Sequence, residues 1–362
     1  MSIVGMKPTL APQGQTMKVA VVVPTIRRNC IHRFLEAWHS EFATCDVLVV
    51  EDNPEASFDL GEYPNVVHYA WSDIDRELGE QAWIIPRRTD CVRSFGFLKA
   101  YQREPDMIVT LDDDCMPGPE GAEGFLARHW ARLEGCGEQR AWRRTGEGPA
   151  TRGYPYYGLD RRWRCMLNHG MWVGVPDFDS PTAMQQSREA RTFSVVNQTI
   201  PVGEYFPMCG MNLAFRPELA PAMFFLLMGQ GYDYDRFGDI WAGLFVKRIC
   251  DHFGYAVTSG EPVVTHLRAS NVWANLRKEA PGLELNETLW QLVDSVVLTG
   301  LSVAECYQQL ARALRDRDTG SDYLTRLGSA MLTWTELFEP SSDSVVSLHG
   351  ARTQIAQRRV VP

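Results

Sequence analysis

Three short apolar runs in the first third of the chain limit the folds that it can adopt. They span residues 18–25, 46–53 and 107–111 and contain many β-branched residues. Apolar runs without polar alternation are typical of strands that are buried on both faces of a parallel sheet. Residues 31–42 and 91–102 lie between these runs and have the apolar spacing of helices. This alternation of strand and helix predicts an α/β fold in which crossover connections join parallel strands.

Three adjacent aspartates, Asp112, Asp113 and Asp114, follow the third apolar run directly. Neighbouring carboxylates repel one another and are costly to remove from water, so something must compensate their charge. A solvated turn would do so, because aspartate is common in turns and Pro117 follows closely. A divalent cation would also do so, because oxygen ligands suit Mg²⁺ and Mn²⁺, and these ions hold phosphates in turn.

The place of these acids in the predicted sheet favours a ligand site. In open parallel sheets, ligands bind beyond the carboxyl ends of the strands. Thr25, Asp52 and the aspartate triplet each follow such an end, so we expect their loops to form one crevice. Asp52 could hydrogen-bond a base or a ribose there, with a turn-capping acid as the alternative. Arg93, on a helix near the sheet edge, could contact phosphate or base, or form a surface ion pair.

A metal site at this crevice needs a further ligand from a distant part of the chain, and His266 is the candidate. It follows an apolar run in VVTHLRASN, which places it at the expected end of a strand. Alone, such a histidine is more often a satisfied surface or core residue. With Asp112 and Asp114 as partners, ligation of Mn²⁺ or Mg²⁺ is the better interpretation, and octahedral geometry leaves positions for phosphate oxygens and water. Asp112 and Asp113 could also hold the ribose or a metal-bound water.

Two residues farther along the chain are candidates for contact with a sugar. Asp239 precedes the segment IWAG, where it could cap a helix or present a carboxylate to the sugar. His169 stands beside Gly170 and could contact the sugar or be structural. Carboxylates and imidazoles exchange protons in enzymes, so both residues are candidates for proton transfer.

Composition and missing motifs exclude several classes of function. The formal net charge of the 362-residue chain is -9, which argues against general attraction to nucleic acid or to an anionic membrane. No GxGxxG motif follows the first strand and no Walker A sequence occurs, so a Rossmann dinucleotide site or a P-loop is poorly supported. The nine cysteines include no CxxC pair, and the N-terminus lacks the apolar segment of a signal peptide, so we expect a cytoplasmic protein.

The rest of the chain predicts further helices around this core. Residues 222–229 form the most apolar later run, which is too short to span a bilayer and predicts a buried helix. Residues 239–253 have the spacing of an amphipathic helix. The predicted organisation has four parts: a flexible N-terminal arm at 1–16, a catalytic domain at 17–282, a helical segment packed on it at 283–338, and a flexible tail at 339–362.

The order of several motifs resembles the UDP-arabinopyranose mutases, which are also called reversibly glycosylated polypeptides and are best known from plants. The matching stretches run in family order from about residue 18 to residue 338 and include VVPTIR, DIWAG and ICDHFGY. LDDDC at 111–115, RGYPY at 152–156 and FPMCGMNLAF at 206–215 form a specific combination, well beyond a single DxD motif.

The resemblance implies a GT-A-like nucleotide-sugar-binding fold with a mostly parallel central sheet and C-terminal helices, dependent on Mn²⁺ or Mg²⁺. It also implies interconversion of UDP-arabinopyranose and UDP-arabinofuranose without a flavin. Members can transfer the sugar onto themselves at the arginine of the RGYP motif, which corresponds to Arg152. The chain departs from the plant members at Leu159, where they usually have a second arginine, and at Gly238, where they have an acid. Both departures bear on the identity of the sugar.

Three functions agree with this pattern. The first is a mutase, in which Arg152, Asp239 and His169 are catalytic and the partner is a UDP-sugar, with UDP-arabinose as the first candidate. The second is a metal-dependent glycosyltransferase that passes the sugar of a UDP-sugar donor to an external acceptor. The third is a non-catalytic scaffold subunit, and the intact aspartate triplet and Arg152 count against it because a scaffold requires neither. A homo-oligomer is compatible with all three.

Overall fold

The predicted N-terminal arm at 1–16 lies outside the residues that the structure describes, as does the predicted tail beyond residue 339. The computed structural model describes residues 17–135, 137–140, 142, 147, 149, 152–155, 160–175, 177–185, 195–267, 271–317 and 320–339. None of the helices in these ranges has both the length and the apolar character that crossing a membrane requires.

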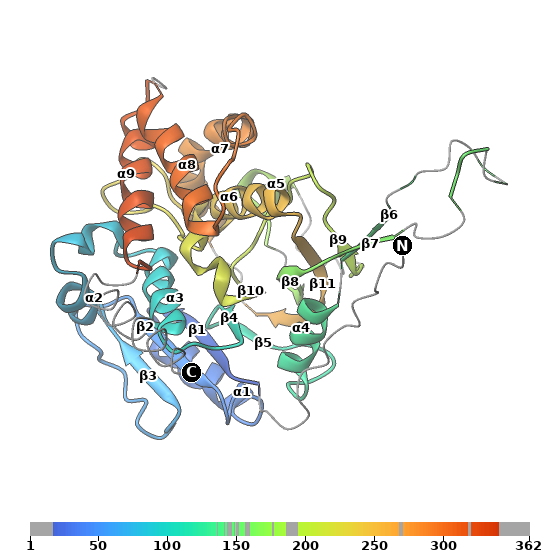
Figure 1. The fold of residues 1–362 in the computed structure, drawn as a ribbon. Coiled ribbons are helices and arrows are strands. Elements are labelled where there is room, and N and C mark those ends of the chain that lie inside the picture. The colour runs from blue at the N-terminus through green and yellow to red at the C-terminus, as the bar shows by residue number, and fades with distance from the viewer. Residues whose placement is uncertain are drawn as a thin grey trace, which may run out of the picture.

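Within the described residues, a nine-stranded sheet runs through the centre of the molecule (Figure 1). Its strands are β1 (Val19–Thr25), β2 (Asp46–Glu51), β3 (Val66–Tyr69), β4 (Met107–Leu111), β5 (Cys115–Pro117), β8 (Cys165–Gly174), β9 (Gln198–Thr199), β10 (Asn212–Phe215) and β11 (Ala256–His266). The order is β3-β2-β1-β4-β10-β8-β11-β5, and β9 pairs with β11 off this path. β1 to β4 are mutually parallel, β10 is antiparallel to β4 and β8, and β11 is parallel to β8. Most strands of the sheet therefore run in one direction.

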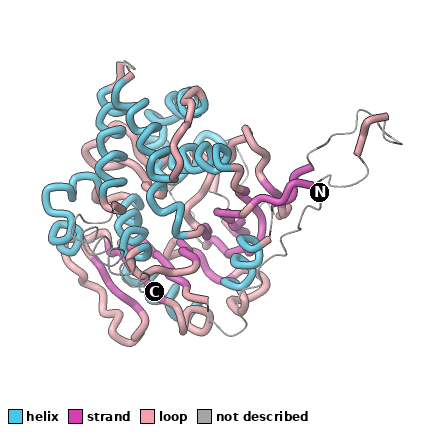
Figure 2. The backbone as a smooth tube through the Cα atoms, in the orientation of Figure 1, coloured by secondary structure: helices cyan, strands magenta, loops and turns pink. Residues whose placement is uncertain are grey.

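Helices cover both faces of the sheet, as the cyan and magenta tubes of Figure 2 show. Val19, Val21 and Val23 pack in one apolar cluster, whereas Ala20 and Val22 pack in the other, because successive side chains of a strand point to opposite faces. The first cluster includes residues of α1 (Arg28–Trp38) and α4 (Phe125–Glu134). The second includes residues of α3 (Arg93–Tyr101), α6 (Gly238–Phe253), α8 (Val303–Asp316) and α9 (Asp322–Glu336).

The remaining described elements are short or peripheral. Figure 1 shows the paired strands β6 (Gly137–Arg140) and β7 (Asp160–Trp163) extending away from the body of the molecule. The other helices are α2 (Trp71–Leu78), α5 (Ser180–Gln185) and α7 (Val272–Asp294), with the 3-10 helices η1 (Gly79–Ile84), η2 (Asp90–Val92) and η3 (Pro217–Ala222).

The structure confirms the predicted fold class, an α/β chain with a mostly parallel central sheet and C-terminal helices. The three apolar runs form β1, β2 and β4, and the helical stretches between them form α1 and, after η2, α3. α7 begins at Val272, where the side chain of Asn271 accepts the backbone N–H groups of Trp273 and Ala274. The helix ends only at Asp294, so it continues across the predicted boundary between residues 282 and 283.

The prediction of a helix at residues 222–229 is wrong, although most of the segment is buried. η3 ends at Ala222, and the chain then continues in an irregular conformation in which Leu226 has a φ of 65°. Buried backbone groups outside a regular element need other partners. The N–H of Phe225 donates to Ser94 Oγ at 3.0 Å, and its carbonyl oxygen accepts from Cys91 Sγ at 2.6 Å. Side chains of η2 and α3 thus replace hydrogen bonds that a helix would have made.

Gly96 allows α3 to pack closely on the sheet. A Cβ atom at this position would lie 2.4 Å from Val22 Cγ1 and 3.1 Å from Val50 Cγ2, and both side chains belong to the core. Arg93 begins the same helix, so this packing also sets the distance of Arg93 from the strand ends.

We expect Gly96→Ala to lower the free energy of unfolding by about 1–2 kcal/mol, because the overpacked methyl group outweighs the gain in helix propensity. Urea denaturation followed by circular dichroism measures this change. Gly61→Ala is the control, because a Cβ there meets only Asp59 Oδ1, at 3.5 Å. Equal stability of the two variants would show that α3 does not depend on this close contact.

Candidate functional site

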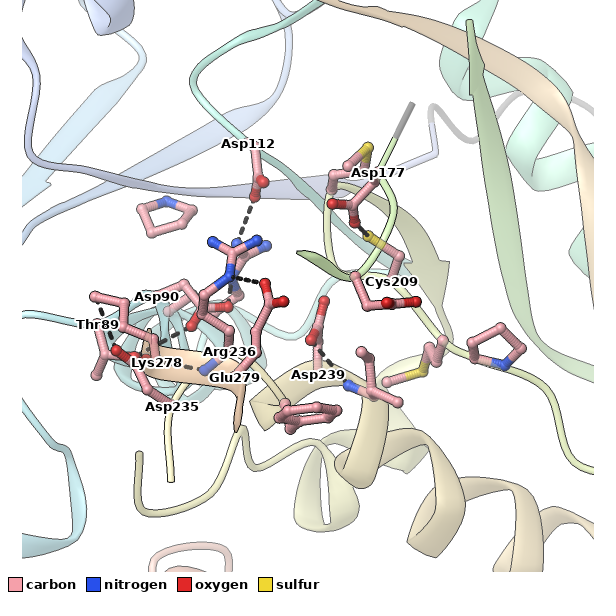
Figure 3. Close-up of a pocket in the computed structure, with 18 of the residues that line it drawn as sticks. Thr89, Asp90, Asp112, Asp177, Cys209, Asp235, Arg236, Asp239, Lys278 and Glu279 are labelled. Atoms are coloured by element: carbon pink, nitrogen blue, oxygen red, sulfur yellow. Dashed lines mark hydrogen bonds and ion pairs between the residues drawn. The ribbon is translucent and has the colours of Figure 1, made fainter. Parts of the chain in front are cut away.

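A cavity of about 1020 Å³ lies at the carboxyl ends of β1, β2 and β4. Thr25, Asp52 and the aspartate triplet line it, which confirms the prediction that these strand ends meet in one crevice. The sheet-side half of the cavity is the part lined by Thr25, Arg27, Asp52, Arg93, Asp112, Asp113, Asp114 and His266. The helix-side half, which Figure 3 shows, is the part lined by Asp90, Asp177, Cys209, Asp235, Arg236, Asp239, Lys278 and Glu279.

Two arginines compensate the charge of the aspartate triplet. Arg27 donates from Nη2 to Asp113 and, at 3.1 Å, to Asp114 Oδ2. Arg93 donates from Nη2 to Asp112 Oδ1. The protein itself therefore supplies a counter-charge to each of the three carboxylates, in a crevice rather than in a solvated turn.

Asp113 is the most buried member of the triplet, with 2% of the residue exposed. Thr25 Oγ1 donates to Asp113 Oδ2 at 2.6 Å and so fixes the orientation of the carboxylate. Burial raises the pKa of Asp113 to about 6, although the hydrogen bond from Thr25 and the charge of Arg27 both act to lower it.

Arg93 is a core residue rather than part of a surface ion pair, since only 2% of it is exposed. Its Nη1 donates to the carbonyl oxygen of Gly210 at 2.7 Å and to Thr110 Oγ1 at 3.1 Å. Burial acts to lower the pKa of Arg93, but the charges of Asp112 and Asp90 outweigh it and raise the pKa. A Cβ on Gly210 would lie 3.0 Å from Arg93 Nη1, so this glycine of the FPMCGMNLAF stretch leaves room for the guanidinium.

His266 lies beside Asp114, as the metal hypothesis requires. Its Nδ1 is 2.8 Å from the carbonyl oxygen of Val175, which can only accept, so Nδ1 carries a proton and Nε2 is the nitrogen that a neutral ring offers to a cation. Nε2 is 3.9 Å from Asp114 Oδ1, a gap that one cation with bonds of about 2.1 Å could bridge. The two side chains therefore fit as ligands of Mn²⁺ or Mg²⁺.

Asp112 lies differently from these two residues, because its carboxylate is paired with Arg93. In the described part of the chain, no three histidine, cysteine, aspartate or glutamate side chains form a ready-made metal site. Asp112 as a third protein ligand therefore stays a prediction. Oxygens of a bound diphosphate and water would suit the remaining positions around a cation that Asp114 and His266 hold.

Asp52 is held at the end of β2 by two donors. Trp71 Nε1 donates to Asp52 Oδ1 at 2.7 Å, and the backbone N–H of Arg88 donates to the same oxygen at 3.0 Å. The guanidinium of Arg88 lies 4.9 Å from the centre of the Trp71 ring. Burial raises the pKa of Asp52. This fixed acceptor beside an aromatic ring and a cation suits the base or ribose of a nucleotide.

Asp239 lies in the first turn of α6 and faces the cavity. Its Oδ2 accepts the N–H of Gly210 at 2.8 Å, and its Oδ1 accepts the N–H of Ile240 at 2.9 Å. Burial, together with the negative charge of Asp90, raises the pKa of Asp239 to about 7. Asp239 is therefore able to change its protonation state near neutral pH, as its predicted role in proton transfer requires.

Ion pairs organise the rest of the helix-side half (Figure 3). Arg236 Nε donates to Glu279 Oε1 at 2.7 Å, and Lys278 Nζ lies 2.8 Å from Asp235 Oδ2. The other oxygen of Glu279 accepts the N–H of Ser180 at 2.7 Å, which joins α7 to α5. The wall of this half is therefore held together by charge across segments that are distant in the sequence.

Two more acids of the helix-side half retain their protons more readily than usual. Burial raises the pKa of Asp177, whose Oδ2 is 3.5 Å from the donating Sγ of Cys209. Burial also raises the pKa of Asp90. Together with Asp239, these residues give the pocket several carboxyl groups that face one another across a small space.

Two predicted catalytic residues do not line the cavity. His169 is 3% exposed, and its Nδ1 is 3.0 Å from Ser259 Oγ. Its ring packs near the rings of Trp172 and Phe206, and burial lowers its pKa to about 4. Arg152 is exposed and belongs to the segment between β6 and β7. The structure thus brings together Thr25, Asp52, Arg93, the triplet, Asp239 and His266, but it does not bring His169 or Arg152 to their cavity.

The cavity residues that were not singled out from the sequence include five charged ones that the site uses: Arg27, Asp90, Asp177, Arg236 and Glu279. Arg27 had a local signal, because it follows the end of β1 by two residues. Arg236 had a weaker one, because it is the single cation in the acidic stretch DYDRFGD. Asp90, Asp177 and Glu279 had no such signal in the sequence, because the segments that they face are distant from them along the chain.

We expect Asp239→Asn to weaken the dependence of stability on pH. The folded-state pKa of about 7 lies above the ordinary 3.8, so the folded state binds the proton more tightly and stability falls as the pH rises between these values. Asparagine does not titrate, so the free energy of unfolding should fall less over this range than in the wild type. Urea denaturation at several pH values tests this, with Asp233→Asn at an exposed position as the control. A wild-type slope in Asp239→Asn would contradict the raised pKa.

Comparison with known proteins places the chain in a family. A family model described as "Reversibly glycosylated polypeptide" matches residues 15–342. A probable UDP-arabinopyranose mutase 2 from Solanum tuberosum is 35% identical over 346 residues, which cover 91% of this chain and 92% of that protein. UDP-arabinopyranose mutase 1 from Arabidopsis thaliana is 35% identical over 334 residues, which cover 88% of this chain and 91% of that protein. The chain belongs to the reversibly glycosylated polypeptide family.

Proposed function

We propose that this chain is a UDP-arabinopyranose mutase-like enzyme that interconverts the pyranose and furanose forms of a UDP-pentose. The observation that carries the proposal is the division of the cavity. Its sheet-side half has the carboxylates, arginines and histidine that suit a metal-bound diphosphate, and its helix-side half has the acids that suit a sugar. The two relatives that align with 91% and 88% of the chain are named as UDP-arabinopyranose mutases.

The sheet-side half would bind the nucleoside diphosphate. Asp52 would accept a hydrogen bond from the base or ribose, next to the ring of Trp71. Asp114 and His266 would hold Mn²⁺ or Mg²⁺, and a bound cation would neutralise negative charge that develops on UDP as the C1–O bond breaks. Arg27 would add positive charge on the same side, because it already contacts Asp114.

The helix-side half would hold the pentose while its ring changes. A pyranose and a furanose of one pentose differ in whether O5 or O4 closes the ring. After the C1–O bond to UDP has broken, O4 bonds to C1, the bond between O5 and C1 breaks, and UDP then returns to C1. During this exchange O4 loses a proton and O5 gains one. Asp239 suits the transfer, because a carboxyl group with a pKa of about 7 can accept a proton and return it at neutral pH.

The role of Arg152 rests on the family resemblance, because the residue is exposed and outside the cavity lining. As a covalent carrier, one of its nitrogens would bond to C1 as UDP leaves, and a carboxylate would take the proton that this nitrogen loses. As a phosphate clamp, it would stabilise the diphosphate by a bidentate contact and be glycosylated only as a side reaction.

The proposed activity is tested by incubating the pure protein with UDP-arabinopyranose and Mn²⁺, and we expect UDP-arabinofuranose to form, as measured by chromatography.

Asp114→Ala should abolish this conversion and, in calorimetry with Mn²⁺, weaken UDP binding by about tenfold or more, because a cation ligand is lost. Asp233→Ala, at an exposed position, is the matched control. Equal UDP affinity with Mn²⁺ and with a chelator would remove the metal from the proposal, and transfer of another sugar to an acceptor, with UDP-arabinose unchanged, would replace the mutase by a transferase.

We expect Arg152→Ala to lose mutase activity in either role, because both need the guanidinium. Arg152→Lys separates the roles, since it keeps the charge but loses the planar fork. Mutase activity in Arg152→Lys without glycosylated protein in intact mass spectrometry would favour the clamp and contradict an obligatory carrier. Full activity in Arg152→Ala would exclude both roles.

A further inference from the structure

Arg236 is fixed in the helix-side half of the cavity by contacts at two ends. Its backbone has a φ of 68°, and its N–H is bonded to Asp235 Oδ1 at 2.9 Å. Its Nε donates to Glu279 Oε1 at 2.7 Å (Figure 3). Glu279 is itself only 4% exposed and accepts the N–H of Ser180 with its other oxygen. The plane of the guanidinium is therefore set by a carboxylate that cannot move freely.

The outer edge of this guanidinium is open. No described residue accepts a hydrogen bond from Arg236 Nη1 or Nη2, and Arg236 lines the cavity with 34% of its side chain exposed. Among the other cations that line the cavity, Arg27 and Arg93 donate to the aspartate triplet, Lys278 pairs with Asp235, and Arg88 lies against the ring of Trp71 beside Asp52. Arg236 thus presents two Nη groups without an acceptor among the described residues, in a planar fork that suits bidentate binding.

The surroundings of the fork favour hydroxyl groups over phosphate. The charges of Asp177 and Asp90, besides that of Glu279, act on Arg236, and Asp239 lines the same half of the cavity. A phosphate placed here would face the ion-paired carboxylate of Glu279 and would make ionisation of Asp90, Asp177 and Asp239 still more costly, because like charges in a poorly solvated pocket repel strongly. A sugar hydroxyl accepts from an arginine and donates to a carboxylate, so a neutral sugar satisfies both kinds of group.

We propose that Arg236 is the residue that holds the pentosyl group, donating from its two Nη groups to sugar oxygens, and that Glu279 is the positioning residue for it. The proposal rests on the proposed function and adds a role to it. A mutase must keep the pentosyl group in place after the C1–O bond to UDP breaks, because diffusion of water to C1 would give free arabinose. Contacts that fix the sugar without contacting UDP serve this purpose.

The proposal is tested by comparing the affinities of UDP and UDP-arabinopyranose in calorimetry with Mn²⁺. In Arg236→Gln, binding of UDP should stay within about twofold of the wild type, whereas binding of UDP-arabinopyranose should weaken by roughly 10- to 100-fold, as expected for lost hydrogen bonds from a charged group. Unchanged UDP binding also shows that the variant is folded. Arg164→Gln, which removes an exposed arginine paired with the exposed Glu218, is the matched control and should change neither affinity.

Two further variants examine the geometry. Arg236→Lys keeps the charge but not the fork, so it should recover less than half of the lost binding free energy. Glu279→Gln removes the charge that orients Arg236, so it should weaken UDP-arabinopyranose binding but not UDP binding. In the conversion assay, Arg236→Gln should release more free arabinose per UDP-arabinofuranose formed than the wild type. A purely structural defect would lower both products and leave this ratio unchanged.

The test of Arg236 and the test of the mutase function can fail independently of each other. Equal weakening of UDP and UDP-arabinopyranose binding in Arg236→Gln would make Arg236 a phosphate contact and overturn the proposal, as would no weakening of either. If the wild type binds UDP-arabinopyranose but does not convert it, the mutase function fails, while the affinity difference still decides the role of Arg236.

Discussion

The ion pairs at the carboxyl end of β4 are the interaction on which the rest of the site depends. Three adjacent carboxylates there face two guanidinium groups, those of Arg27 and Arg93. The arginines come from the loop after β1 and from the start of α3, so neutralising the triplet also ties two crossover connections to the end of β4. With one more carboxylate than guanidinium in the cluster, an attraction for a further positive charge remains.

The two halves of the cavity use charge in different ways. On the sheet side, each acid of the triplet has an arginine partner, and Nε2 of His266 lies 3.9 Å from Asp114 Oδ1. On the helix side, burial raises the pKa values of Asp177 and Asp239, and no described residue accepts from the Nη groups of Arg236. A diphosphate therefore suits the first half, and a neutral group with hydroxyls suits the second.

Sequence reasoning succeeded where a local pattern decides the structure. A continuous β-branched run predicts a buried strand, and the ends of parallel strands must share an edge, so the meeting of Thr25, Asp52 and the triplet could be predicted. It failed where partners come from distant segments. The apolar run at 222–229 is irregular because Ser94 and Cys91 bond its backbone, and neither residue is near it in the sequence. The sequence likewise did not show that Arg236, which precedes α6, pairs with Glu279 of α7.

Gly238 illustrates how this irregular segment shapes the sugar side of the cavity. A Cβ atom on Gly238 would lie 2.5 Å from the carbonyl oxygen of Phe225 and 2.9 Å from Cys91 Sγ, so no side chain fits while the segment keeps its course. The resemblance to the plant members implies an acid at this position there, and in this chain such an acid would require Phe225 to move. Asp239, the next residue, keeps its place because its carboxylate is bonded to the N–H of Gly210. A side chain at position 238 would therefore change the packing behind the helix-side half, whereas the sheet-side half is built from strand ends that Gly238 does not contact.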